Sequence, residues 1–188
     1  PVDPKAHLFA VTMTLSQPKP VQVFSLPAWL PGSYMVRDFA KNIIELKAQD
    51  ANGQTLKLIQ LDKQTWSVDN NISEIILTYQ VYAWDLSVRT AHLDTTHGFF
   101  NGSSVFLSAH GFEQQTHTVT MLPPSEPTLG DWRVATSMTR ISGDDFAFGQ
   151  FSATSYDELI DHPVEMGLFT LASFNACGVQ HDIVLNGR

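Results

Sequence analysis

The sequence has little of three things that mark common protein classes: cysteine, basic residues and long apolar runs. Its single cysteine, Cys177, allows no disulfide framework; we expect it to be a small buried residue in a reducing, cytoplasmic compartment, with periplasmic or secreted locations left open. Eleven Lys and Arg residues against nineteen acidic ones give a net charge of −8, which excludes a nucleic-acid partner. No apolar run reaches the ~20 residues of a membrane-spanning helix, so no membrane partner is expected.

Several catalytic motifs are also missing. None of the seven histidines is followed by Glu, so the chain lacks the His-Glu-x-x-His pattern with which zinc peptidases hold their metal and polarise its water. Gly-x-Ser-x-Gly elbows and phosphate-binding glycine loops are absent too. We therefore expect no complete active site and no cofactor in this chain.

Alternation of apolar and polar residues with a period of two is the main pattern that is present. It runs through 7–15, 75–83 and 179–185, as strands with one buried face require. Turn signals such as Asn52-Gly53 and Pro123-Pro124 separate the runs at spacings typical of a sandwich rather than of βαβ units. The sequence predicts an all-β fold, an antiparallel β-sandwich with a C-terminal strand pair.

Two segments depart from the strand pattern and predict short helices. In "SYDELIDHP", Ser155 and Glu158 form a capping box, and Pro163 forces the preceding residue out of helical geometry. In 27–42, Ser33 is a candidate cap for a turn or two of helix. A helix that follows a run of strands indicates a change of structural unit near 155.

The stretch 89–102, "RTAHLDTTHGFFNG", holds a compact trio with metal-ligand chemistry, His92, Asp94 and His97. If 88–94 is a strand, His92 and Asp94 share one face, and His97 can fold back from the following loop. Gly98 and the paired phenylalanines after it indicate a loop packed against a neighbour, and no further strong ligand has a clear position. We therefore predict no metal here and prefer a hydrogen-bonded corner or a contact surface.

Six stretches, in one order from Leu26 onward, resemble the N-terminal domain of the glycyl aminopeptidase family, metallopeptidase family sixty-one. They are "LPAWLPGSYMVRDFAKNI", "DKQTWSV", "YQVYAWDLSVRTAHLDTTHGFFNGSSVFL", "GDWRVAT", "YDELIDHPVEMGLF" and "GVQHDIVLNG". The resemblance implies a sandwich like the N-terminal domain of aminopeptidase N, followed in the parent protein by a thermolysin-like zinc domain and a PDZ domain. It places the sandwich at 1–153, and at 154–188 the capped helix and first strands of the peptidase domain. Because the chain opens on Pro1 and stops at Arg188 after a strand-like run, we expect a piece of that parent.

The resemblance implies a non-catalytic domain that shapes the substrate cleft of a zinc aminopeptidase and supports its catalytic domain. The fragment itself is not expected to be an enzyme, and the zinc belongs to the parent, which would remove N-terminal residues such as glycine. The expected partners are the catalytic domain and a peptide substrate, and a fragment dimer through 168–185 is expected because a cut strand pair exposes an edge and an apolar face. Residues on loops are our candidates for the surface that faces substrate or the catalytic domain: Tyr34, Arg37, Asp38, Arg89, His92, Asp94, His97 and Asn101.

Three alternatives stay open at this point. Ion pairs Arg37–Asp38 or Arg89–Asp94, buried at the domain interface, would give those residues a structural role. The chain would instead be a free-standing β-sandwich module for glycan or protein if its four tryptophans, Trp29, Trp66, Trp84 and Trp132, formed a binding surface. A small metal-dependent enzyme built on the histidine and aspartate trio is the third alternative.

Overall fold

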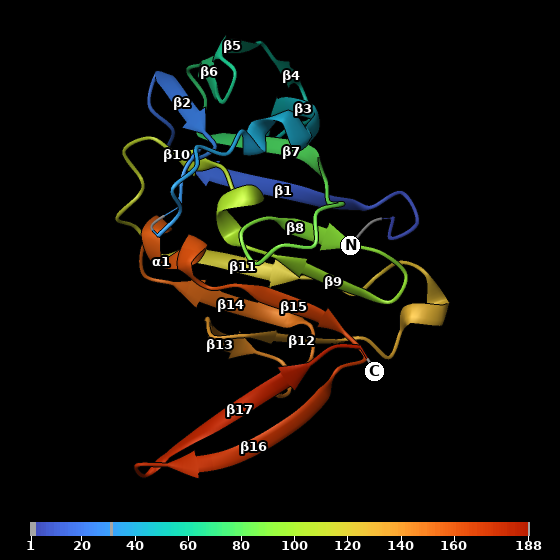
Figure 1. Ribbon diagram of the computed structural model, residues 1–188. Coiled ribbons are helices and arrows are strands. Elements are labelled where there is room, and N and C mark those ends of the chain that lie inside the picture. The colour runs from blue at the N-terminus through green and yellow to red at the C-terminus, as the bar shows by residue number, and fades with distance from the viewer. Residues whose placement is uncertain (1–2, 31, 188) are drawn as a thin grey trace.

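The computed structural model describes residues 3–30 and 32–187, so the expectations that rested on Pro1 and Arg188 lie outside the described residues. Within these ranges all strand pairs are antiparallel, and the strands form four sheets of three or four strands and one separate hairpin (Figure 1). The predicted all-β antiparallel fold is confirmed. No helix in the described part of the chain is long and apolar enough to span a membrane.

The first sheet has the strand order β1-β7-β3-β4 and supplies one wall of the core. Its strands are β1 (Leu8–Ser16), β3 (Ile43–Asp50), β4 (Thr55–Leu56) and β7 (Glu74–Tyr82). The odd positions of β7, from Ile75 to Val81, are all buried, as the alternation predicted. His7 was predicted to lie on the face of β1, but it precedes the strand with φ of 61°.

The second sheet, of order β10-β2-β6-β5, packs its apolar residues into the same core. It consists of β2 (Val21–Ser25), β5 (Leu58–Asp62), β6 (Thr65–Asp69) and β10 (Ser108–Ala109). Phe24 and Val68 are fully buried, and Trp66 beside them is nearly so. Since large apolar side chains release the most surface from water, these positions anchor the sheet.

Two further sheets complete the body of the molecule. The three-stranded sheet β11-β14-β13 is formed by β11 (His117–Met121), β13 (Thr139–Ser142) and β14 (Gly149–Ala153). The sheet β12-β15-β9-β8 is formed by β8 (Ala91–Leu93), β9 (His97–Phe100), β12 (Arg133–Thr136) and β15 (Val164–Gly167). β15 lies between β9 and β12, so a late segment of the chain holds two earlier ones together.

The predicted capped helix is present as α1 (Tyr156–Asp161). The Ser155 hydroxyl accepts a hydrogen bond from the Glu158 amide at 3.2 Å, and the Glu158 carboxylate accepts one from the Thr154 amide at 2.6 Å. The carboxylate therefore reaches one residue further back than a standard capping box, and His162 is extended before Pro163, as expected.

The second predicted helix is shorter and lies later than expected. Ser33 does not cap it: the Ser33 hydroxyl accepts a hydrogen bond from the Met35 amide in a local turn, and the 3-10 helix η1 (Phe39–Asn42) begins after Asp38. Serine competes for nearby backbone amides in turns as readily as at helix ends, which explains the difference. Two other 3-10 helices are η2 (Gly102–Ser104) and η3 (Pro127–Leu129).

The C-terminal hairpin of β16 (Thr170–Ala176) and β17 (Val179–Leu185) projects from the lower end of the body, in red in Figure 1. The strand pair is confirmed, but neither of its faces is buried. Apolar side chains stand exposed on it, namely Phe174, Val179, Ile183 and Leu185. Cys177 was predicted to be buried and is instead exposed in the hairpin turn, because the hairpin has no neighbour to cover it.

Candidate functional site

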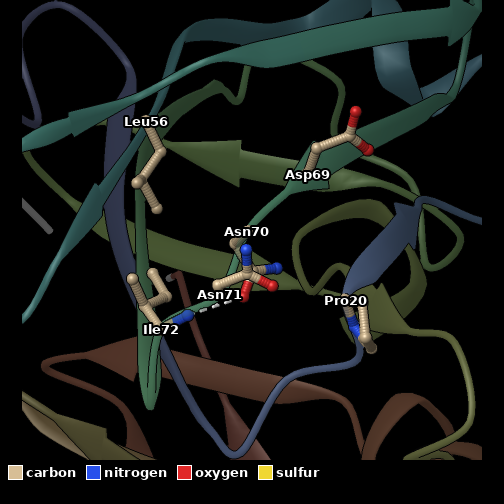
Figure 2. A pocket seen from close by; sticks show the side chains of 6 residues that line it. All are labelled: Pro20, Leu56, Asp69, Asn70, Asn71 and Ile72. Atoms are coloured by element: carbon tan, nitrogen blue, oxygen red, sulfur yellow. Dashed lines mark hydrogen bonds between the residues drawn. The ribbon is translucent and has the colours of Figure 1, made fainter.

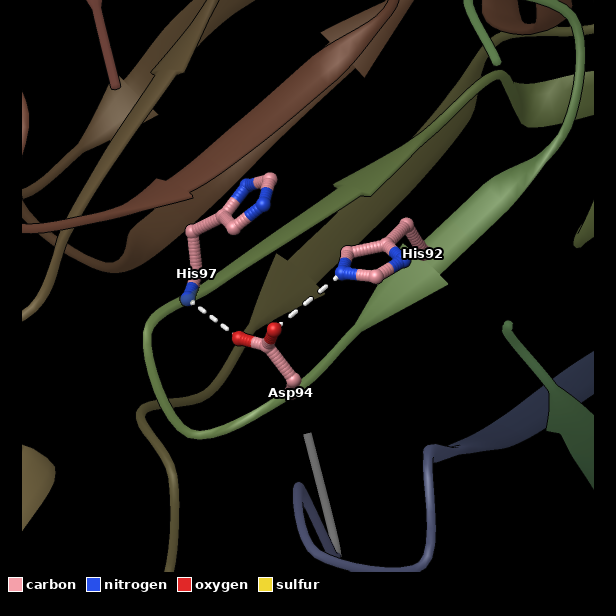
Figure 3. A group of neighbouring side chains, drawn as sticks. All are labelled: His92, Asp94 and His97. Atoms are coloured by element: carbon pink, nitrogen blue, oxygen red, sulfur yellow. Dashed lines mark hydrogen bonds and ion pairs between the residues drawn. The ribbon is translucent and has the colours of Figure 1, made fainter. Parts of the chain in front are cut away.

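The tight turn between β8 and β9 brings the predicted trio together (Figure 3). One carboxylate oxygen of Asp94, Oδ1, accepts three hydrogen bonds from the turn: from the Thr96 amide and hydroxyl, both at 2.6 Å, and from the His97 amide at 3.0 Å. An aspartate that bonds backbone amides two and three residues later is a strong turn former. Asp94 therefore folds His97 back beside His92, as the sequence predicted.

His92 is the buried member of the trio, with 6% of its surface exposed. Its Nε2 atom lies 3.3 Å from the second carboxylate oxygen of Asp94, Oδ2. The ring of Trp84 stacks on the His92 ring at 5.0 Å between centroids, and the ring of His97 lies 4.9 Å away. His92 Nδ1 is buried without a hydrogen-bond partner among the residues that the structure describes.

Glu165 of β15 is a fourth polar residue at this place. Its Oε1 atom lies 3.0 Å from Nδ1 of His97, and the side-chain Nδ2 of Asn186 donates a hydrogen bond to the same oxygen. Glu165 is not among the candidate site residues that the sequence indicated. Only the pairing of β15 with β9 brings it to His97. The paired residues lie 64 or more positions apart in sequence, from Phe100 with Val164 onward, and no local sequence pattern predicts such a pairing.

Asp94 is a carboxylate at neutral pH. Burial raises its pKa, but the hydrogen bonds from Thr96, His97 and His92 outweigh burial and hold the pKa of Asp94 well below its ordinary value. A negative charge therefore stands beside the His92 ring at neutral pH. Across 3–30 and 32–187, these three residues form a group whose donor atoms lie close enough, within 4.8 Å of one another, to share a cation.

The remaining predicted site residues lie on loops but do not join the trio. Asn101 caps η2: its Oδ1 atom accepts hydrogen bonds from the Ser103 amide and hydroxyl. Arg89 is exposed and Tyr34 is fully exposed. Arg37 donates its backbone amide to Ala28 O at 2.6 Å, which closes the loop at 28–37.

Neither of the two alternative ion pairs forms among the described residues. Asp38 pairs with Lys63 at 2.5 Å on the surface, and Asp94 pairs with His92 instead of Arg89. The Arg37 Nε atom is buried without a partner among these residues. Its charge is thus not offset by Asp38.

A surface hollow of about 500 Å³ lies elsewhere, between the end of β6 and the start of β2 (Figure 2). Its polar groups serve the local turn: Asn70 donates its side-chain amide to Lys19 O and Val68 O, and its Oδ1 accepts from the Ile72 amide. With its amide already bonded, and with Asp69 as its one ionisable lining residue, the hollow lacks a catalytic set of groups.

Comparison with known proteins decides the family. The model of the peptidase M61 N-terminal domain matches residues 1–168. The chain belongs to the M61 peptidase family. The expectation from the sequence motifs is therefore confirmed, and the strands from β1 to β15 lie within the matched M61 N-terminal domain.

One solved structure of high similarity supports this assignment. An aminopeptidase N family protein from Idiomarina loihiensis is 42% identical and superposes with a TM-score of 0.95; the match covers 100% of this chain and 32% of that one. The M61 domain thus spans about a third of the length of that relative. An M1 zinc metallopeptidase from Deinococcus radiodurans matches 92% of this chain and 40% of its own, at 11% identity and a TM-score of 0.47. No curated protein sequence matches.

This chain does not contain the zinc-binding motif His-Glu-x-x-His that the family resemblance leads us to expect in the parent protein. His-Glu-x-x-His places two histidines one helical turn apart, and the sequence holds no such pair. The trio at 92–97 lies instead on a strand hairpin and includes Asp94 between its histidines. No step of peptide hydrolysis is assigned to these residues.

Proposed function

We propose that the chain is the non-catalytic N-terminal domain of a zinc aminopeptidase, in which it supports the catalytic domain and forms one wall of the substrate cleft. The match of residues 1–168 to the M61 N-terminal model carries this proposal, and the threefold greater length of the solved relative supports it. The parent would hold its zinc in the later domain, remove N-terminal residues such as glycine, and carry a PDZ domain.

The cheapest test is the gene downstream of Arg188. The proposal expects an open frame with a His-Glu-x-x-His motif and, in the purified parent, release of N-terminal residues from peptides with free but not acetylated N-termini. A frame that ends soon after Arg188, or that lacks the motif, would remove the proposal. A cytoplasmic location stays a prediction, to be tested by cell fractionation of the parent.

The loop at 28–38 is the first surface that we propose for contact with substrate or the catalytic domain. Apolar side chains stand exposed along it, namely Trp29, Tyr34, Met35 and Val36. Hydrogen bonds within the loop, from Trp29 Nε1 to Ser33 O at 2.7 Å and from the Arg37 amide to Ala28 O, hold its shape. A loop with hydrogen bonds of its own and exposed apolar side chains is typical of a contact surface.

In the full-length parent, Tyr34→Ala should lower kcat/KM about tenfold, equivalent to about 1.4 kcal/mol, because it removes the most exposed aromatic side chain of the proposed contact surface. Since Tyr34 is fully exposed in this domain, the substitution should leave the stability of the domain unchanged. Ile141→Ala, at a half-exposed position on β13, is the matched control and should leave kcat/KM unchanged. Equal effects of both substitutions would remove the loop from the proposed surface.

The hairpin of β16 and β17 is the second proposed contact surface. Its exposed apolar residues fit strands that are completed by the following domain, which is the expected role of 154–188. Cut from that domain, the 188-residue chain should self-associate through 168–185, whereas a chain that ends at residue 168 should stay monomeric. Monomeric 188-residue chain in analytical ultracentrifugation would count against this role.

The boundary expected at residue 153 stays a prediction too. α1 and β15 lie beyond it, yet β15 pairs with β9 and β12. Comparing the solubility and unfolding of chains that end at 153 and at 168 tests where the sandwich ends. The glycan-module alternative gains no support from the tryptophans, since Trp66 and Trp132 lie buried in the core.

A further inference from the structure

We propose that His92, Asp94 and His97 bind one divalent transition-metal ion of the zinc class, at a site separate from any zinc of the catalytic domain. The proposal rests on the geometry of the β8–β9 turn and of the residues packed against it, so it stands or falls independently of the proposed function. Figure 3 shows the two rings and the carboxylate on the same side of that turn.

The two carboxylate oxygens of Asp94 have different contacts. Oδ1 is saturated by the Thr96 and His97 hydrogen bonds, whereas Oδ2 has His92 Nε2 as its neighbour at 3.3 Å. A tetrahedral zinc ion with bonds of about 2.0–2.1 Å separates its ligand atoms by roughly 3.3–3.4 Å. These two atoms thus already have the spacing of two ligands, with no backbone movement.

His97 supplies the third ligand. Its Nδ1 atom lies 3.0 Å from Glu165 Oε1, so we assign the ring proton to Nδ1, which donates a hydrogen bond to the Glu165 carboxylate and leaves the Nε2 lone pair free. A carboxylate behind a metal-binding histidine is the usual second layer of a zinc site. One donor atom from each residue of the trio lies within 4.8 Å of the other two. Binding one ion therefore requires the His97 side chain to rotate toward the other two ligand atoms.

The ring of His92 is held in place by packing. It lies between Trp84 and His97, and the Trp84 backbone bridges to His92. When Nε2 binds a cation, the proton of the ring moves to Nδ1, which is buried without a partner in the described part of the chain. This weakens the site and favours ions that bind imidazole strongly.

The donor set selects the class of ion. Two imidazoles and one carboxylate suit Zn²⁺, Ni²⁺ or Cu²⁺, whereas Mg²⁺ and Ca²⁺ prefer oxygen ligands throughout. Three protein ligands leave a fourth position open. The bound ion would tie the β8–β9 turn to β15 through Glu165.

The test is to measure zinc binding by the 188-residue chain with isothermal titration calorimetry and to compare its thermal unfolding with and without Zn²⁺. We expect about one equivalent of zinc and a rise in Tm on binding. Asp94→Asn and His97→Gln should each weaken binding at least ~10-fold, and Glu165→Gln should weaken it about tenfold with unchanged stoichiometry. Asp94→Asn keeps an oxygen for the turn hydrogen bonds, so the fold should survive, which circular dichroism checks.

His181→Gln is the matched control, because His181 is an exposed histidine on the separate hairpin. It should bind zinc as the unchanged chain does. The proposal is overturned if the chain binds no zinc, if zinc leaves the Tm unchanged, or if His181→Gln weakens binding as much as the trio variants. Zinc binding that persists in folded Asp94→Asn and His97→Gln would place the ion elsewhere and overturn it as well.

Discussion

Replacement of Tyr79 by Phe should destabilise the domain although it removes a single oxygen atom. Tyr79 is 3% exposed in the middle of β7, and its hydroxyl donates to Val105 O at 2.8 Å and accepts from the Leu107 amide at 3.3 Å. Both partners belong to the loop that follows η2. Phenylalanine fills the same space but leaves a buried carbonyl and a buried amide without partners.

The size of the effect follows from these two groups. A buried polar group left unpaired costs roughly 1–3 kcal/mol, and the longer 3.3 Å bond is the weaker of the two, so we expect a loss of about 2–4 kcal/mol. For a domain of this size the Tm should fall by about 4–16 °C. Urea unfolding followed by tryptophan fluorescence measures the loss as a shift of the midpoint at constant slope.

Tyr82→Phe, on the same strand, is the control: Tyr82 is 41% exposed, so the change should stay within about 0.5 kcal/mol. If Tyr79→Phe proves as stable as Tyr82→Phe, the two hydrogen bonds contribute nothing and the reasoning fails.

A pH profile gives an independent check. Burial raises the pKa of Tyr79 above the ordinary value of 10.0, against a smaller opposite effect of the Leu107 hydrogen bond. The unfolded chain therefore releases this proton first, so the stability that the group contributes is present below pH 10 and falls as the pH rises further. Tyr79→Phe should remove part of that alkaline loss.

Two further substitutions test the contacts around α1. Gly102→Ala should destabilise the domain by about 1–3 kcal/mol, since a Cβ atom there would lie 2.9 Å from the Ile160 backbone. Gly130→Ala is the control and should destabilise it less, because the nearest atom to its Cβ would be 3.3 Å away. Equal urea midpoints of the two variants would contradict this prediction. Hydrogen bonds from the Thr154 hydroxyl and amide lower the pKa of Glu158. The stability that Glu158 contributes is therefore present above its ordinary pKa of 4.5 and is lost as the pH falls through the lowered pKa. Glu158→Gln should reduce the loss of folding stability at acid pH, and an unchanged loss would refute the assignment.

The strands and α1 could be predicted because their signals are local. Alternation over 75–83 places its apolar residues on one face of a strand, and Ser155 with Pro163 marks both ends of the helix. The meeting of His92, Asp94 and His97 was predictable for the same reason, since six residues span a tight turn. The family motifs predicted more than the local patterns did, because a resemblance to a known family implies the fold of the whole domain.

Long-range pairing set the limit of prediction. Glu165 reaches His97 only through the β9–β15 register. Trp84 is near His92 in sequence, but an isolated backbone bridge outside the named strands is what sets the two residues side by side. The predicted burial of Cys177 was wrong because burial depends on what packs over a strand. The amino-acid composition of the hairpin resembles that of a hairpin with a buried face. Each of these depends on the tertiary arrangement rather than on neighbours in sequence.

The central position of β15 has a consequence for synthesis on the ribosome. β9 and β12 both precede it, but their shared sheet cannot close until residues 164–167 have left the exit tunnel. Until then two strand edges stand open in the nascent chain, exposed to wrong partners. A pause in translation before this segment should raise misfolding, whereas a pause after it should not.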